Sequence, residues 1–348
     1  MKQIFACLSL AALVVMLGAC SSEPAAGPET AAEPQQQGPI REINNVTGDL
    51  YRARNNGHFT VFLVTPEGII LSDTISREFS VWLKEELATR FPGNPVKYVV
   101  YSHSDYDHAS GGEVFADTAQ FVGHENMKTA LAPPSGDRPL PENAAAMDAN
   151  SNGAVEMNEA TGFIQANFML FDANNDHMLS GAEIARGPVS DVYPPTETYS
   201  GQKKTVTLGG KTVEMIHPGV QHSANMSIIH FPAEDAVFVV DLLSLKRMPF
   251  RNMPGYDLDE WMKEIQFVED FGADIVIGGH GDVGTPADVA DVREYLETLR
   301  DQVQAGIDAG SSLDQMKASI KMEEYSSWAS YEEWLPLNIE GMYRMLTS

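Results

Sequence analysis

The stretch Tyr98-Val-Val-Tyr-Ser-His-Ser-Asp-Tyr-Asp-His-Ala-Ser-Gly-Gly112 decides how the rest of the chain is organised. It opens with an apolar, β-branched run that is typical of a buried strand, and it then breaks off into a polar turn. The turn holds His103, Asp105, Asp107 and His108. Imidazoles and carboxylates crowd like this mainly where a cation compensates them, because bare carboxylates at this spacing repel each other. The pattern predicts a metal site at one strand end; the alternative is an acidic loop with two incidental histidines.

Length and composition indicate a globular protein. The chain has 348 residues, and 43% of them are hydrophobic. Its formal net charge of −26 argues against a nucleic-acid partner, which needs clustered Lys and Arg to neutralise its phosphates. The sequence does not indicate an oligomeric state.

The N-terminal residues predict export and a lipid anchor. Met1-Lys-Gln is followed by a short apolar run and by Leu17-Gly-Ala-Cys20, which resembles a bacterial lipoprotein signal. The resemblance implies a signal peptide over 1–19, lipidation of Cys20, and membrane contact through that anchor only. Ser21 matches lipoproteins sorted to an outer membrane, so we expect the bacterial cell envelope, on the periplasmic side; a simple cleaved signal with a free Cys is the alternative. Residues 20–45, rich in Pro, Ala and Gln, predict a flexible tether.

Strand-like and helix-like segments alternate in two similar halves, which predicts an α/β sandwich. Two hairpins are expected, over 59–73 around a Pro-Glu-Gly turn and over 204–216 around Gly-Gly. A helix over 76–91 would be capped by Ser76, and a second helix is expected over 257–271. Further strands are expected at 120–124, 226–231, 236–240 and 275–277, and mostly helix from 286 to the end.

Three further polar residues fall beside later strands: His222, Asp241 and, in a Gly-Gly-His-Gly turn, His280. Together with the opening motif they resemble the signature of the metallo-β-lactamase superfamily, over about 48–130 and 196–348. The resemblance implies an αββα sandwich formed by residues 46–135 and 193–348, with an insertion at 136–192.

The resemblance also implies a dinuclear hydrolase. One metal would be held by His103, Asp105 and His222, a second by Asp107, His108 and His280, and Asp241 would bridge the two. Asp107 and Asp241 are the implied catalytic residues. Two such metals can clamp a bridging hydroxide that attacks a small-molecule ester, thioester, lactone or phosphoester. A β-lactamase and a di-iron redox enzyme are alternatives, although true β-lactamases usually have Cys or Ser where this chain has Asp241.

Asp105 departs from the family pattern, which usually has His at that position. A carboxylate makes the site harder, so iron or manganese become alternatives to zinc, which we still favour. His124 is either a partner of the site or structural, and His217 is expected to be structural. His58 and His230 have no supporting motif. A basic group after Asp241 could receive an anionic substrate, although a solvated loop is the simpler interpretation; it comprises Lys246, Arg247 and Arg251.

The predicted insertion contains two twelve-residue stretches, 148–159 and 172–183, that resemble the calcium loops of EF-hands. The implied calcium ligands are Asp148, Asn150, Asn152, Ala154 and Glu159 in the first loop, and Asp172, Asn174, Asp176, Met178 and Glu183 in the second. The loops start 24 residues apart, which leaves one helix over 160–171 between them. Few charges, and His177 at a position that favours Gly, predict weak, structural calcium binding. An acidic surface loop is the alternative.

These patterns favour a membrane-tethered, metal-dependent hydrolase with a small α-helical EF-hand pair, set where it could border the metal cleft. The alternative is a calcium-binding envelope lipoprotein whose transition-metal site is structural or inactive.

Overall fold

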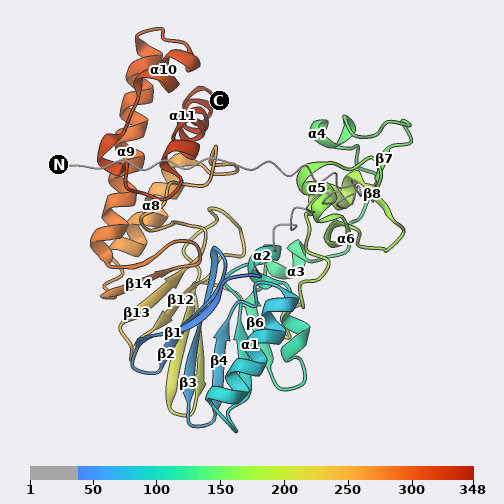
Figure 1. The fold of residues 1–348 in the computed structure, drawn as a ribbon, viewed down its shortest axis with the longest axis vertical. Helices are drawn as coiled ribbons and strands as arrows, with labels where there is room; N and C mark the ends of the chain where they lie inside the picture. Colours follow the sequence, from blue (N-terminus) through green and yellow to red (C-terminus); the bar gives the residue numbers. More distant parts are fainter. Residues whose placement is uncertain (1–37) are drawn as a thin grey trace, which may run out of the picture. The chain divides into compact units, whose positions relative to one another are not determined.

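A computed structural model describes residues 38–348, and residues 39–348 form one compact unit (Figure 1). The predicted signal peptide, Cys20 and most of the predicted tether lie outside the described residues. The tether prediction is wrong at its C-terminal end, because strand β1 (Arg41–Thr47) begins inside it. This strand lies at a sheet edge and pairs antiparallel with β2 (Leu50–Asn55). The sequence of β1 is mostly polar and shows no apolar run that would predict a strand. The strand is defined by its backbone hydrogen bonds to β2 at the edge of the sheet.

The first sheet has seven strands in the order β1-β2-β3-β4-β5-β6-β9. The predicted hairpin over 59–73 is confirmed, with β3 (His58–Thr65) antiparallel to β4 (Gly68–Ser72). From β4 onward the strands run parallel, so their carboxyl ends meet at one edge. These parallel strands continue with β5 (Val96–Val100), β6 (Gln120–His124) and β9 (Glu197–Tyr199).

The second sheet has six strands in the order β10-β11-β12-β13-β14-β15. The hairpin expected over 204–216 is confirmed as β10 (Lys203–Leu208) and β11 (Lys211–Ile216). The remaining strands are β12 (Ile228–Phe231), β13 (Ala236–Val239), β14 (Ile275–Gly278) and β15 (Val283–Gly284). Apolar side chains of both sheets, such as Leu63 and Phe238, form one buried cluster, so the two sheets pack face to face.

Helices cover the outer faces of both sheets, which completes the predicted α/β sandwich. Helix α1 (Arg77–Arg90) packs on the first sheet, and Ser76 caps it as expected by accepting a hydrogen bond from the amide of Phe79. The C-terminal helices pack on the second sheet around residues such as Trp261 and Leu296. They are α8 (Leu258–Glu269), α9 (Pro286–Asp308), α10 (Leu313–Ser319) and α11 (Tyr331–Thr347). Short helical turns follow β5 and β6, namely α2 (Tyr106–Ala109), η1 (Gly112–Phe115) and α3 (Met127–Ala130).

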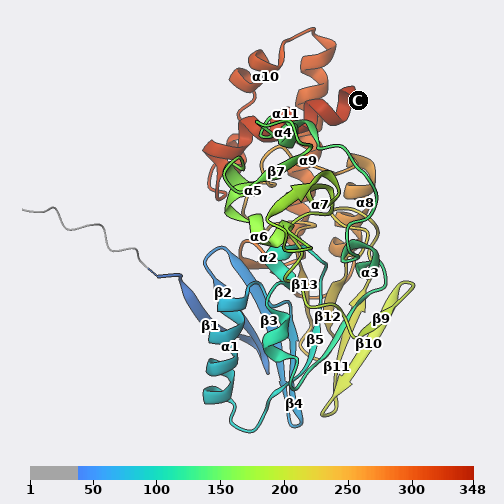
Figure 2. The same ribbon diagram turned by 90° about the vertical axis from the view of Figure 1, so that its right-hand side faces the viewer.

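The segment from Glu142 to Arg186 has a small apolar core of its own around Val155, Phe168 and Leu179. Its elements are α4 (Glu142–Ala145), β7 (Ala154–Glu156), α5 (Gly162–Ala166), α6 (Phe168–Phe171), β8 (Met178–Ser180) and α7 (Gly181–Arg186). The single helix expected over 160–171 is wrong: it is broken at Asn167, whose backbone leaves the helical region. In both views (Figure 1 and Figure 2), α6 lies close to α2.

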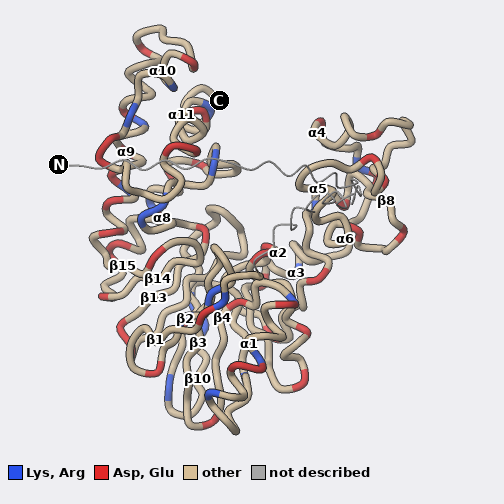
Figure 3. The backbone as a smooth tube through the Cα atoms, in the orientation of Figure 1, with Lys and Arg blue, Asp and Glu red and all other residues tan. Residues whose placement is uncertain are grey.

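Two surface properties bear on partners. Figure 3 shows Lys and Arg scattered singly among more numerous Asp and Glu, in keeping with the net charge of −26. Within residues 38–348, none of the helices combines the length and the apolar character that a membrane span needs.

Candidate metal centre

Four side chains from three strand ends form the first ligand group. His103 and Asp105 follow β5, His222 lies in the loop before β12, and Asp241 follows β13. The His222 Nε2 atom lies 3.2 Å from Asp105 Oδ2 and 3.5 Å from Asp241 Oδ2. The His103 Nε2 atom lies 3.6 Å and 3.3 Å from the same two oxygens. Atoms that bind one ion at about 2.0–2.2 Å lie roughly 3–3.6 Å apart, so this spacing fits a shared metal.

A second group shares Asp241 with the first. Asp241 Oδ2 lies 3.2 Å from His108 Nε2, and Asp241 Oδ1 lies 3.1 Å from His280 Nε2. The two histidine Nε2 atoms are themselves 3.0 Å apart. Asp107 stands slightly further off, with its Oδ2 atom 3.8 Å from both of those nitrogens. The structure therefore brings together all seven residues that the sequence placed at the centre.

Tyr256 holds His222 with one ring nitrogen pointing into the centre. The Tyr256 hydroxyl donates to the carbonyl oxygen of Asp241 at 2.6 Å and lies 3.1 Å from His222 Nδ1. A carbonyl can only accept, so the hydroxyl oxygen is left to accept a hydrogen bond from Nδ1–H. The lone pair of His222 is therefore on Nε2, the atom that faces Asp105 and Asp241.

Ser102 and the buried Asp73 orient the ring of His103 so that its Nε2 atom points into the centre. Asp73 accepts hydrogen bonds from the Ser102 amide at 2.8 Å and from its hydroxyl at 2.7 Å. The hydroxyl, having donated its proton, accepts from His103 Nδ1 at 2.9 Å. His103 is fully buried and its Nε2 atom has no hydrogen-bond partner among the described residues. An unpaired buried nitrogen lone pair facing a carboxylate is costly unless a cation lies between them.

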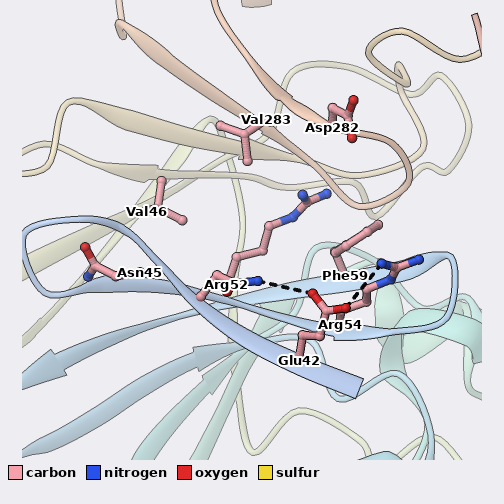
Figure 4. A pocket seen from close by; sticks show the side chains of 9 residues that line it. Glu42, Asn45, Val46, Arg52, Arg54, Phe59, Asp282 and Val283 are labelled. Atoms are coloured by element: carbon pink, nitrogen blue, oxygen red, sulfur yellow. Dashed lines mark hydrogen bonds and ion pairs between the residues drawn. The ribbon is translucent and has the colours of Figure 1, made fainter. Parts of the chain in front are cut away.

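A backbone carbonyl and an arginine side chain fix His280 and the turn that carries it. The Gly57 carbonyl lies 3.0 Å from His280 Nδ1, which sets Nδ1–H and leaves the lone pair on Nε2. Arg52 of β2 points toward the segment that carries Asp282 (Figure 4). Its guanidinium donates to the carbonyls of Gly278, at 3.3 Å, and Gly281, on either side of His280. The His280 turn is therefore tied to the first sheet although it follows a strand of the second.

The donor set fits transition-metal ions. Three histidines present Nε2 lone pairs fixed by their Nδ1 partners, carboxylates complete each group, and His103 Nε2 lacks any other partner among residues 38–348. Mixed imidazole and carboxylate sites suit zinc, iron and manganese.

Proton affinities in this cluster reflect its charge. Burial lowers the pKa of His108, but the Asp241 and Asp107 carboxylates outweigh that effect and raise the pKa to about 9. Burial would raise the pKa of Asp105, yet the His103 and His222 rings bring it below its ordinary value. With its pKa raised, the His108 imidazole holds its proton more tightly than a free histidine does, and an entering metal must displace that proton.

The backbone is strained at the same place. His222 and Asp241 both have positive φ, at 61° and 55°, and Asp73 has φ 46°. A non-glycine residue in this region costs on the order of 1–3 kcal/mol and persists where the surroundings enforce it. The strained residues are thus two ligands that face each other and the buried carboxylate behind His103.

A cavity of about 490 Å³ opens onto the two groups, and five of their seven residues line it: Asp105, Asp107, His222, Asp241 and His280. Apolar side chains supply much of its wall, among them Leu243, Phe250 and, from helix α5, Phe163. Phe163 contacts Tyr106 of α2 edge to face, with ring centroids 5.8 Å apart. Arg247 lines the same cavity and stacks over the Trp334 ring at 4.7 Å. The cavity thus combines a polar floor, apolar walls and one guanidinium.

A family profile described as the metallo-beta-lactamase superfamily matches residues 56–280, which include every residue of the two groups. The chain belongs to the metallo-β-lactamase superfamily. This superfamily typically binds two metal ions, and most of its members are hydrolases.

Individual relatives are distant. The chain is 21% identical to the 2,4-dinitroanisole O-demethylase subunit alpha of a Nocardioides species, over 70% of this chain and 58% of that protein. It is 22% identical to a linear primary-alkylsulfatase of a Pseudomonas species, over 74% and 48%. The chain therefore spans about half the length of the curated relatives it matches.

Two solved structures show the same fold. The sec-alkylsulfatase Pisa1 of a Pseudomonas species has a TM-score of 0.59 at 15% identity, covering 88% of this chain and 50% of that one. A metallo-beta-lactamase from Pontibacter korlensis has a TM-score of 0.51 at 18% identity, covering 74% and 99%. At these identities the likeness concerns the fold alone.

Sequence reasoning missed three contributors to this metallo-β-lactamase centre. His58 is the first residue of β3, with its Nε2 atom 3.2 Å from Asp107 Oδ2. Asp73 directly follows strand β4, and that position after a strand was the signal that could have revealed it. Tyr256 gave no sequence signal, because its role depends on how the loop before α8 returns to the cavity. His124 stacks on His217 with ring centroids 4.3 Å apart, away from the ligand groups.

Proposed function

We propose that this protein is a hydrolase of small-molecule esters that depends on two transition-metal ions. The observation that carries the proposal is the position of Asp241, whose carboxylate faces His103 and His108 through one oxygen and His280 through the other. A carboxylate between two imidazole groups can join two ions into one centre.

The residues of the centre divide into ligands of one ion, ligands of the other ion, and Asp241, which both ions would share. His103, Asp105 and His222 would hold one ion, and His108, His280 and Asp107 the other, with Asp241 between them. When bound, the ions would supply Lewis acidity toward an ester and toward water at neutral pH. Asp107 faces the cavity with one quarter of its side chain exposed and is placed to accept a proton from an attacking water.

The cavity wall favours a substrate with an apolar part. Phe163, Phe250 and Leu243 would pack against a hydrocarbon group, while Arg247 could receive an anionic one. Two of the similar proteins are alkylsulfatases, and an alkyl sulfate carries both a hydrocarbon group and an anionic group. We therefore place sulfate esters beside carboxylic esters, thioesters, lactones and phosphoesters as candidate substrates.

Zinc remains the favoured metal, with iron or manganese as alternatives at the group that contains Asp105. Its carboxylate replaces the imidazole usual in the family, and oxygen ligands suit harder ions. Elemental analysis of the purified chain decides among them.

We also propose that the insertion binds calcium as an EF-hand pair. What supports this is the pairing of β7 with β8, which sets Val155 of one loop opposite Leu179 of the other. The sixth residues of the loops, Gly153 and His177, have φ 86° and 64°, as the calcium loop requires. The last residues, Glu159 and Glu183, accept hydrogen bonds from backbone amides near each loop's start.

We further propose that the chain is exported and carries a lipid anchor on Cys20, which would hold the enzyme at the membrane of a bacterial envelope. Mass spectrometry of the membrane fraction tests this part, because a lipidated Cys20 adds the mass of its acyl chains to the mature N-terminus. A soluble, unmodified mature chain would contradict it.

The test of function is a panel of substrates with a matched variant. Metal-loaded wild type is assayed on sulfate, carboxylic, phosphate and thioesters, on a lactone and on a β-lactam, beside Asp241→Asn. We expect turnover on at least one ester that chelation abolishes and that the variant lacks. Two bound metals without turnover on any substrate would instead indicate a calcium-binding lipoprotein whose metal site is structural.

A further inference from the structure

His58 is the first residue of β3 and points its Nε2 atom at the metal centre. We infer that His58 is an additional nitrogen ligand of the ion held by His108 and His280, and that the two ions therefore differ in kind. This inference rests on the proposed function, because it concerns the composition of the same centre.

Three imidazole nitrogens converge on one oxygen of Asp107. Its Oδ2 atom lies 3.2 Å from His58 Nε2, and 3.8 Å from the Nε2 atoms of both His280 and His108. His58, Asp107 and His280 each offer a ligand atom within 4.8 Å of the others. A single imidazole beside a carboxylate is explained by an ordinary ion pair. Three imidazole nitrogens that face the same carboxylate oxygen are instead typical of residues that bind one metal ion.

The start of β3, which carries His58, is fixed relative to the centre. The amide of Phe59 donates to the Gly279 carbonyl at 2.9 Å, and the Gly57 carbonyl faces His280 Nδ1 at 3.0 Å. The backbone on both sides of His58 is thus bonded to the turn that carries His280. The two rings cross edge to face, with centroids 4.6 Å apart. His58 is therefore held beside the centre and has no need of a long loop movement to reach it.

With His58 counted, the two groups have unequal donors. The group around Asp107 has three imidazoles from His58, His108 and His280, whereas the group around Asp105 has two. Nitrogen-rich sites bind zinc more tightly than iron or manganese, and oxygen-rich sites reduce that advantage. The centre is expected to hold zinc beside His58 and to accept iron or manganese beside Asp105.

Two variants separate ligation from positioning. His58→Ala removes the nitrogen ligand and the contact with Asp107. His58→Gln keeps an N–H group that can donate to Asp107 but offers no imidazole nitrogen. His230→Ala is the matched control, because His230 on β12 also pairs with a carboxylate, at 3.0 Å from Glu214, and lies outside the ligand groups.

The readout is zinc affinity of the metal-free full chain, measured by competition with a chromophoric chelator. Wild type is expected to bind two zinc ions, one tighter than the other. Both His58 variants should weaken the tighter site by about 10–100-fold or more, while His230→Ala leaves both sites unchanged. Thermal unfolding of the metal-free variants identifies any that fail to fold.

A second measurement tests the difference in metal. After growth with equal zinc, iron and manganese, wild type should contain zinc and one harder ion, and His58→Ala should lose mainly zinc.

The possible failures are distinguishable. Wild-type affinity in His58→Gln would make His58 only a positioning residue and overturn the inference, as would unchanged affinity in His58→Ala. Either result leaves the proposed function intact, whereas a wild type that binds no transition metal overturns both.

Discussion

Tyr256→Phe should weaken the ion held by His222 while preserving the fold. The substitution removes one hydroxyl, which donates to the Asp241 carbonyl at 2.6 Å and faces His222 Nδ1 at 3.1 Å. The ring keeps its stacking on Trp261, with centroids 4.0 Å apart. Burial holds the pKa of Tyr256 well above its ordinary value, so the hydroxyl remains a donor throughout any practical assay.

The expected size follows from the bonds lost. Leaving a buried polar group without its partner costs about 1–3 kcal/mol, and each 1.4 kcal/mol is about tenfold in affinity. Partners of metal-bound histidines are commonly worth about 10–100-fold in metal affinity. We therefore expect Tyr256→Phe to weaken the ion at His222 by about 10–100-fold, with a smaller effect on the ion beside His280.

The assay is stepwise zinc competition on metal-free protein, with Tyr343→Phe on α11 as a matched control away from the cavity. Thermal unfolding of the metal-free forms separates lost stability from lost affinity. Affinities within twofold of wild type at both sites would refute the argument that Tyr256 fixes the His222 tautomer.

Four other outcomes are expected. Asp105→His should shift metal content from iron or manganese toward zinc, measured by elemental analysis; an unchanged ratio would contradict the role given to this carboxylate. Zinc affinity should rise with pH up to about 9, because the pKa of metal-free His108 is raised to about 9 and binding displaces its proton; a flat profile between pH 7 and 9 would be inconsistent. For the same reason metal-free protein should lose stability as pH rises from about 6.5 to 9, seen by thermal unfolding. Phe163→Ala should raise KM several-fold for esters with bulky apolar groups and leave kcat nearly unchanged; equal KM values would remove Phe163 from the cavity wall.

Much of the centre was predictable because its residues follow strands. His103, Asp105 and Asp241 each come directly after an apolar run that the sequence marks as a strand, and parallel strands present their carboxyl ends at one edge. His280 follows the Ile275–Gly278 strand in the same way. Local pattern and residue type were sufficient there.

Contacts between distant segments were not predictable. His58 is a histidine without a motif, and its approach to Asp107 depends on how the first sheet packs against the second. Tyr256 reaches His222 only because the loop before α8 folds back over the cavity. The edge strand β1 and the break at Asn167 were missed because each rests on backbone pairing and packing that composition does not encode.

The most direct test of the central claim is the transition-metal content of purified wild type beside Asp241→Ala, measured on the full chain. If Asp241 joins two ions into one centre, wild type contains about two transition-metal ions per chain, and removing the shared carboxylate lowers the affinity for both. A wild type with at most one ion, or an Asp241→Ala protein that retains two with unchanged affinity, would contradict the claim.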